Sequence, residues 1–314
     1  MPKSILGFDV GGTKISAVAG NDSGEIIANL RRPTIKHLGK KRLVQQLVEM
    51  GNEVMEKAGF DVVDSIGILF AGLVDQKNGV VISSPNIPGL NNFNLASEIK
   101  SHFGAPVTLE NDATGAAIAE RLFGSGTDVE NFVYVTLSTG IGGGIFINGK
   151  LYRGSHGLAG ELGHMVIMSN GPTCGCGRKG CLEAIAGGKG IARRVSENIS
   201  AVRESQLFST MRPNDIDAQA VFEAKKHSDM FAQLIIEETV YYLAVGIVNI
   251  VNILDPELII IGGGISRAGN DLFHPLRLAV KEEMRSLARK VKIVRALENG
   301  SDLAAIAVPL FKYE

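Results

Sequence analysis

The stretch Ser-Ile-Leu-Gly-Phe-Asp-Val-Gly-Gly-Thr-Lys at residues 4–14 decides the fold class. An apolar run that ends in a pair of glycines predicts a β-strand followed by a tight turn. Thr13–Gly20 and Glu25–Leu30 predict two further strands, and Lys41–Lys57 has the apolar spacing of a helix. We therefore expect the chain to open with an antiparallel meander that leads into a helix.

The opening pattern returns in the middle of the chain. Residues 131–137 predict a strand, Ser138-Thr139-Gly140 a polar glycine turn, and residues 142–147 the returning strand. Asn148-Gly149 is a strong hairpin signal before a third strand at 151–153. Both copies are followed by helices that alternate with short apolar strands. The sequence thus predicts an α/β protein with an internal duplication.

Composition excludes several classes of protein. Of the 314 residues, 45% are hydrophobic and 21% are charged, as in ordinary globular proteins, and the formal net charge is −1. This charge gives no reason to expect nucleic acid or a membrane surface as a partner. We expect no secretory signal, because Asp9 interrupts the first apolar run, and no membrane span, because Leu243–Leu254 is short and contains two asparagines. A cytoplasmic location is expected.

Glycine turns of this kind can hold phosphate groups. In Asp9-Val-Gly11-Gly12-Thr13-Lys14 the two glycines allow backbone N–H groups to approach a phosphate, Thr13 adds a hydroxyl, and Asp9 could orient hydrated Mg²⁺. An ordinary glycine-rich hairpin has the same composition. A matching turn in the second half contains Thr139 and Gly140, and two such turns could grip a polyphosphate.

Two further motifs have both a structural and a functional interpretation. Gly262-Gly263-Gly264 follows a buried strand, where ligands of α/β proteins bind, but a tight turn explains it equally well. Asp112, in Glu110-Asn111-Asp112, lies where a strand passes into an alanine-rich helix. The sequence alone does not distinguish a helix cap from a catalytic base at this position.

A cluster of cysteines predicts a metal site. All three cysteines of the chain, Cys174, Cys176 and Cys181, lie within eight residues, which is unlike a disulfide framework. Tetrahedral zinc takes four nitrogen or sulfur ligands, and His164 is the nearest candidate upstream for the fourth. We predict a closed, structural zinc site in the loop 164–181.

With these motifs in this order, the chain resembles the ROK family of sugar kinases and repressors, and most closely its ATP-dependent glucokinases. The resemblance covers nearly the whole chain, from the hairpin at Asp9 to Gly262–Gly264. The stretch Gly140–His164 fits the family signature, and Cys-Gly-Cys-Gly-Arg-Lys-Gly-Cys-Leu-Glu at 174–183 fits the family's zinc motif.

The resemblance implies a two-domain, actin-like or hexokinase-like (ribonuclease H-like) α/β fold, with duplicated βββαβαβα units around a cleft. We expect a small domain of residues 1–112 plus 303–314 and a large domain of residues 113–302. The family also implies MgATP as phosphoryl donor and a hexose 6-hydroxyl as acceptor. Family members are often dimers or tetramers, so a homodimer or homotetramer is expected.

The resemblance also implies roles for individual residues. Asp112 corresponds to the general base. His164 would bind zinc through one ring nitrogen and face the sugar with the other. Both hairpins and the third glycine motif would form the ATP site. The remaining implied sugar contacts are Gly72, Asn86, Asn111, Glu161 and Glu183.

Some features depart from the family or leave alternatives open. This chain has Ala71-Gly72 where related kinases usually have Pro-Gly, and Gly187-Gly188 where many have Ser-Gly. Glucose is the expected substrate, with N-acetylmannosamine as the main alternative and fructose or allose as others. We do not expect a transcriptional repressor, because only eight residues precede Asp9 and leave no room for a winged helix. A structural actin-like ATPase would not need Glu161, His164 and Glu183.

Overall fold

A computed structural model describes residues 2–35, 39–84, 87, 89–198, 200, 202, 205, 208–212, 215–285 and 290–313. The chain forms two compact units. The first contains Met1–Asp128 and Leu297–Glu314, and the second contains Val129–Ala296.

The first unit is built on a five-stranded sheet in the order β3-β2-β1-β4-β7. Its strands are β1 (Ser4–Val10), β2 (Lys14–Asn21), β3 (Ile26–Pro33), β4 (Ser65–Phe70) and β7 (Val107–Asn111). The first three pair antiparallel, which confirms the meander that we predicted from the sequence. β1, β4 and β7 are parallel, with Val10 beside Phe70 and Phe70 beside Asn111. Their carboxyl ends therefore meet at one edge of the sheet.

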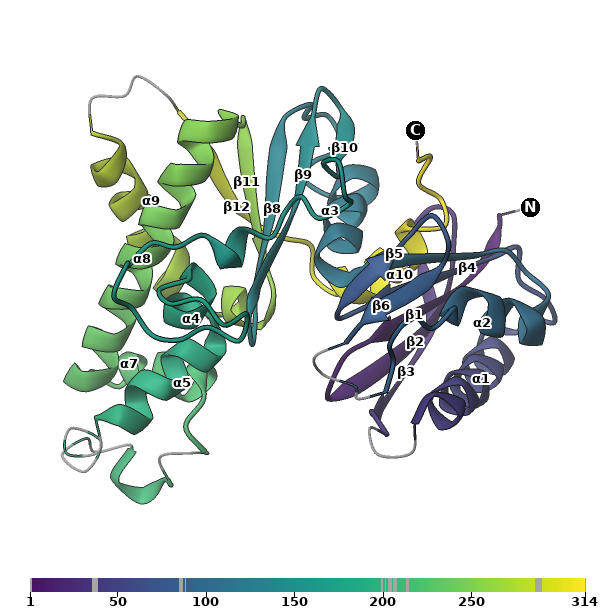
Figure 1. The fold of residues 1–314 in the computed structure, drawn as a ribbon, viewed down its shortest axis with the longest axis horizontal. Coiled ribbons are helices and arrows are strands. Elements are labelled where there is room, and N and C mark those ends of the chain that lie inside the picture. Colours follow the sequence, from purple (N-terminus) through teal and green to yellow (C-terminus); the bar gives the residue numbers. More distant parts are fainter. Residues whose placement is uncertain are drawn as a thin grey trace. The chain divides into compact units, whose positions relative to one another are not determined.

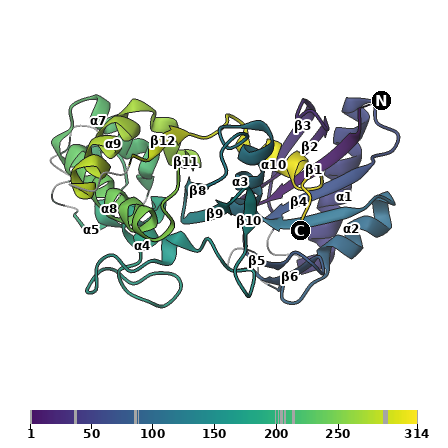
Figure 2. The same ribbon diagram turned by 90° about the horizontal axis from the view of Figure 1, so that it is seen from above.

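Helices cover both faces of this sheet (Figure 1). α1 (Gly39–Ala58) and α2 (Leu95–Phe103) bury apolar side chains against one face. α3 (Asp112–Phe123) and α10 (Gly300–Ala307) lie on the other, where α10 runs beside β1 and β4 (Figure 2). A Cβ atom at Gly67 would lie 2.0 Å from the Ala305 carbonyl oxygen, and one at Gly7 would lie 2.7 Å from the Ala305 Cβ. These two glycines therefore allow α10 to pack closely on the sheet.

A small hairpin of the first unit was not predicted from the sequence. It consists of β5 (Leu73–Asp75) and β6 (Val80–Ser83), which pair antiparallel. Its strands are only three and four residues long and half-buried for the most part, so they lack the apolar alternation that marks longer strands.

The second unit repeats the topology of the first. Its sheet has the order β10-β9-β8-β11-β12, with strands β8 (Phe132–Leu137), β9 (Ile141–Ile147), β10 (Lys150–Tyr152), β11 (Leu258–Gly262) and β12 (Lys292–Arg295). Asn148 and Gly149 both have positive φ, as in the predicted two-residue hairpin turn. The equal strand order confirms the predicted duplication.

The helices of the second unit pack around α8 (Met230–Leu254), which lies in the core. By length and composition α8 could cross a membrane, but most of its apolar window is buried inside the unit. Among the described residues, the unit also contains α4 (Leu182–Ala186), α5 (Gly188–Glu197), α7 (Ala218–Lys226) and α9 (Asn270–Met284). Short 3₁₀ turns are η2 (Leu162–His164), η3 (Phe208–Thr210) and η5 (Gly264–Ala268). The five-residue α4 was not predicted.

The compact units and the predicted domains differ in where they place α3. The predicted boundary follows residue 112, whereas α3 packs on α10 and falls in the first unit. Residues 297–302 likewise belong to the first unit. The domain boundaries of the functional enzyme stay a prediction.

Candidate active site

The carboxyl edge of the first sheet brings together predicted residues that are far apart in sequence. Asp9 lies near the end of β1, and Gly72 follows β4. Asn111 is the last residue of β7, and Asp112 is the first residue of α3. The turn beside Asp9 is closed by a hydrogen bond from Gly11 N to Lys14 O of 3.1 Å. Asn86 lies outside the described residues.

Asn111, and not Asp112, caps α3. The Asn111 side-chain oxygen accepts hydrogen bonds from Ala113 N (3.0 Å) and Thr114 N (3.2 Å), and its Nδ2 donates to Gly72 O (3.2 Å). Asp112 is the first residue of the helix, where a negative charge is favourable. The Asp112 carboxylate also contributes to this helix terminus, because its Oδ1 accepts a hydrogen bond from Ala113 N (2.9 Å).

Asp9 has an unusual electrostatic environment. Burial, followed by the nearby charge of Asp112, raises the pKa of Asp9 to about 7, although a hydrogen bond from the Ser301 side chain opposes the shift. Asp302 adds further negative charge, and it accepts hydrogen bonds from Ser16 Oγ and Arg31 Nη2, both 2.7 Å long. Carboxylates that are held close together in this way are suited to a cation such as Mg²⁺.

Ser301 and Asp302 were not predicted as part of this site. Both belong to α10, almost 300 residues after Asp9 in sequence, and reach it because α10 packs on the first sheet. The one local signal is the polar run Glu298-Asn-Gly-Ser-Asp302, which stands before the apolar stretch 303–311.

The carboxyl edge of the second sheet brings together the other two glycine motifs. Ser138 N donates to Gly140 O (2.9 Å) and closes the turn between β8 and β9. β11 runs parallel to β8, and a Cβ atom at Gly263 would lie only 2.3 Å from Leu137 O. Gly262–Gly264 and Thr139–Gly140 are therefore neighbours at this edge, as an ATP site composed of both motifs requires.

The junction between α4 and α5 forms backbone hydrogen bonds with the turn between β8 and β9. Gly188 N donates to Ser138 O (2.8 Å), and Lys189 N donates to Thr139 O (3.1 Å). A Cβ atom at Gly187 would lie 2.6 Å from Glu183 O, so any larger residue there would require a local shift. Sequence reasoning missed this junction, although Gly187, Gly188 and Gly190 are a visible cluster of small residues.

The predicted zinc ligands converge in the second unit. The ligand atoms of His164, Cys174, Cys176 and Cys181 all lie within 4.8 Å of one another. Cys176 Sγ is 3.7 Å from Cys181 Sγ, and His164 Nδ1 is 3.6 Å from Cys174 Sγ. A tetrahedral zinc ion with Zn–S bonds of about 2.3 Å would separate two sulfurs by about 3.8 Å. The four residues therefore fit a structural zinc ion.

The thiols of this cluster differ in acidity. Hydrogen bonding, chiefly to the backbone of Arg178, lowers the pKa of Cys176 to about 6, whereas burial raises the pKa of Cys174 to about 12. Arg178 also ties the loop to η2 through a hydrogen bond from Nη2 to His164 O (2.6 Å). A bound metal would hold all three cysteines as thiolates, which is the form that ligates zinc.

The predicted sugar ligands of the second unit lie around this cluster. His164 turns Nδ1 toward Cys174, and its Nε2 lies 3.8 Å from Glu161 Oε2. Glu183 lies two residues after Cys181, and its Oε2 accepts a hydrogen bond from Ile141 N (2.9 Å). The two nitrogens of His164 thus face different groups, as the predicted dual role requires.

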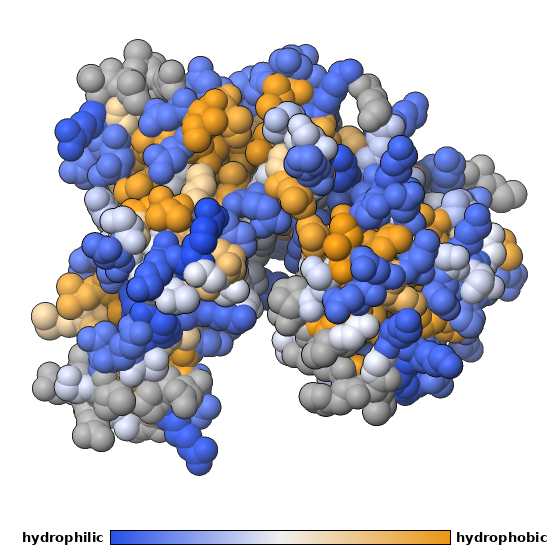
Figure 3. Space-filling view, in the orientation of Figure 1, coloured by the Kyte–Doolittle hydropathy of each residue, from blue (hydrophilic) through white to orange (hydrophobic). Residues whose placement is uncertain are grey.

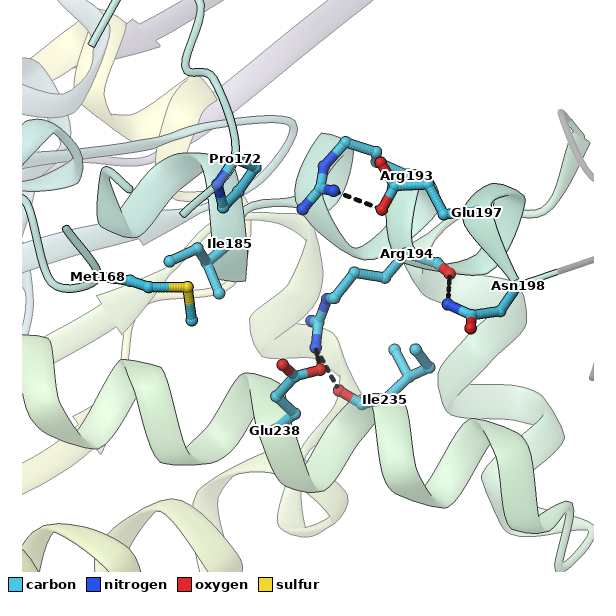
Figure 4. A pocket seen from close by; sticks show the side chains of 9 residues that line it. All are labelled: Met168, Pro172, Ile185, Arg193, Arg194, Glu197, Asn198, Ile235 and Glu238. Carbon is cyan, nitrogen blue, oxygen red and sulfur yellow. Dashed lines mark hydrogen bonds and ion pairs between the residues drawn. The ribbon is translucent and has the colours of Figure 1, made fainter. Parts of the chain in front are cut away.

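A cavity of about 280 Å³ lies behind the metal loop (Figure 4). Met168 and Ile185 form one side, and Arg194 reaches from α5 across to Glu238 on α8. Its wall contains two arginines and two glutamates that pair with each other, Arg193 with Glu197 and Arg194 with Glu238. The opposite charges of each pair cancel on the cavity wall. Arg194 also links α5 to α8.

Comparison with known proteins agrees with these features. A sequence model of the ROK family matches residues 5–307. A glucokinase of Thermotoga maritima is 38% identical over 88% of this chain and 87% of its own, and an N-acetylmannosamine kinase of Haemophilus influenzae is 35% identical over 77% and 79%. The crystal structure of a ROK family glucokinase from Streptomyces griseus, in complex with glucose and AMPPNP, superposes with a TM-score of 0.83 over 98% of both chains at 30% identity. This chain belongs to the ROK family.

Proposed function

We propose that this protein is an ATP-dependent hexokinase that transfers the γ-phosphate of MgATP to the 6-hydroxyl of a hexose, with glucose as the preferred acceptor. The observation that carries this proposal is the carboxyl edge of the first sheet. There Asp112 begins α3 directly after its N-cap Asn111, and its charge acts on the buried Asp9 at the glycine hairpin. The glucokinase relatives support the choice of reaction.

The proposed mechanism is direct, in-line transfer. The hydroxyl oxygen of the sugar attacks the γ-phosphorus while Asp112 accepts the hydroxyl proton. The bond between the γ-phosphorus and the β–γ bridging oxygen breaks, and ADP leaves. Asp9 orients hydrated Mg²⁺ on the phosphates. Most of the catalysis comes from positioning and electrostatic stabilisation, because phosphoryl transfer demands little covalent chemistry of the protein.

The proposed binding roles divide between the two units. The phosphates bind to Gly11, Gly12, Thr13 and Lys14 of the first turn, Thr139 and Gly140 of the second, and Gly262, Gly263 and Gly264. The sugar hydroxyls bind to Gly72, Asn86, Asn111, Glu161, His164 and Glu183. His164 and the three cysteines would hold zinc, which would have a structural role and would fix the loop that carries the sugar ligands.

An N-acetylmannosamine kinase is the second candidate, which the 35% identity to such an enzyme favours. A coupled assay of ADP release with glucose, N-acetylmannosamine, fructose and allose tests both. The proposal predicts the highest kcat/KM with glucose. ATP turnover that no sugar stimulates would contradict the kinase assignment altogether.

We also propose that the enzyme acts in the cytoplasm as a homodimer or homotetramer. Large apolar side chains of α8 are exposed, among them Met230, Leu234 and Ile253, and apolar surface is visible along this helix in Figure 3. Exposed apolar surface of this kind commonly marks contacts between subunits. Light scattering coupled to size exclusion tests the oligomeric state, and a monomer at micromolar concentration would contradict it.

A further inference from the structure

We propose that Glu183 is a positioning residue for the triphosphate, through which the metal loop sets the affinity for nucleotide. This inference rests on the proposed function. Cys181 is the N-cap of α4, so Glu183 lies in the first turn of a helix that begins at a metal ligand. From there Oε2 accepts the hydrogen bond of Ile141 N at 2.9 Å. One short helix thus joins the metal loop to the turn between β8 and β9.

The carboxylate of Glu183 also fits sterically against this turn. A Cβ atom at Gly140 would lie 2.2 Å from Glu183 Oε2 and 3.0 Å from its Cδ. Glycine at position 140 therefore leaves the space that the carboxylate occupies. Glu183 therefore contacts the turn through both a hydrogen bond and close packing, and both contacts restrain the backbone of the turn.

The backbone after Glu183 completes the support of the turn. Gly188 N and Lys189 N donate to the carbonyl oxygens of Ser138 and Thr139. α5 is itself fastened to α8, because Arg194 Nη1 donates to Glu238 Oε2 at 2.6 Å (Figure 4). The segment 183–189 thus contacts the turn at both of its ends, through Glu183 and through Gly188 and Lys189.

Such support matters for phosphate binding in particular. A glycine turn binds phosphate through backbone N–H groups whose directions must converge on one anion. Glycine-rich backbone is conformationally permissive, so an outside contact is needed to keep these groups aligned. Metal in the loop would order the start of α4, and through Glu183 it would order the turn.

The test is direct binding of AMPPNP to the zinc-loaded protein without sugar, by isothermal titration calorimetry. Glu183→Ala removes the acceptor of Ile141 N and is expected to raise Kd roughly ten- to hundredfold, the factor of one hydrogen bond to a charged group. Glu183→Gln keeps a carbonyl acceptor and is expected to bind AMPPNP within about threefold of wild type. Glu197→Ala, at the far end of α5, is the matched control and is expected to change nothing.

Hydrogen exchange provides a readout that does not depend on binding. The amide of Ile141 is expected to exchange faster in Glu183→Ala than in Glu183→Gln, with both variants folded and loaded with zinc. Removing zinc is expected to weaken AMPPNP binding in wild type and much less in Glu183→Ala, because effects that act through one contact are not additive.

The outcomes separate this inference from the proposed function. If wild type binds AMPPNP but Glu183→Ala binds it equally well, or if zinc removal and Glu183→Ala have additive effects, Glu183 does not position the triphosphate. If wild-type protein binds no AMPPNP at all, the proposed kinase function itself fails.

Discussion

Replacing Asp9 by asparagine should stabilise the protein at alkaline pH. Burial and the charge of Asp112 raise the pKa of Asp9 from 3.8 to about 7 in the folded protein. A carboxyl group with a raised pKa favours folding while it is protonated, and this contribution is lost as the pH rises through the folded-state pKa. The wild-type protein therefore loses stability between about pH 4 and pH 7 through this residue.

The size of the effect follows from the pKa values. Each pH unit between the unfolded and folded pKa changes the free energy of unfolding by about 1.4 kcal/mol, so the whole interval corresponds to about 4 kcal/mol. Asparagine is never ionised, and its oxygen can still accept the hydrogen bond of Ser301. Asp9→Asn should therefore equal wild type near pH 4 and exceed it by about 4 kcal/mol at pH 8, a difference that already includes the opposing attraction of Lys14.

Urea unfolding of both proteins between pH 4 and pH 8, in buffer without magnesium and nucleotide, measures this difference. Asp22→Asn is the control, because Asp22 is exposed. The same variant should lose activity, since Asp9 is proposed to orient Mg²⁺. An Asp9→Asn protein that differs from wild type by the same amount at every pH would refute the electrostatic reasoning.

Three further substitutions test other parts of the site. Asp112→Asn should bind sugar normally but lose turnover by roughly 10²–10⁴-fold, and a near-normal kcat in the ADP assay would remove Asp112 as the base. Cys176→Ser should lower both the zinc content by mass spectrometry and the thermal midpoint; full zinc occupancy would contradict the proposed ligand set. Gly263→Ala should cost about 1–3 kcal/mol in urea unfolding, because φ at Gly263 is +84° and the new Cβ would lie 2.3 Å from Leu137 O, whereas Gly264→Ala, with nothing within 4 Å, should be neutral.

Long elements with strong periodicity were predictable from the sequence. The 20-residue α1 and the meander at the start of the chain appear where apolar spacing predicted them. The zinc ligands were predictable because three cysteines within eight residues are typical of a metal-binding loop. In each of these cases the signal lies within one continuous stretch of sequence.

Features that depend on tertiary packing were not predictable. Which of Asn111 and Asp112 is the N-cap of α3 could not be predicted, since both side chains can cap a helix, and the structure shows that it is Asn111. The role of Asp112 as the base stays a prediction. Ser301 contacts Asp9 only because α10 returns to the first sheet, and backbone hydrogen bonds from Gly188 and Lys189 require no particular residue type. Such contacts leave no pattern in the sequence.

The two halves differ mainly in what lies between the third strand and the following long helix. In the first half five residues, 34–38, separate β3 from α1, whereas in the second half 77 residues, 153–229, separate β10 from α8. The repeated frame supplies a glycine turn at the carboxyl edge of each sheet. The insertion supplies the metal loop together with Glu161, His164 and Glu183. We therefore expect the repeated frame to supply the phosphate-binding turns, and the insertion to supply the sugar ligands of the second unit and, through Glu183, the support of the second turn.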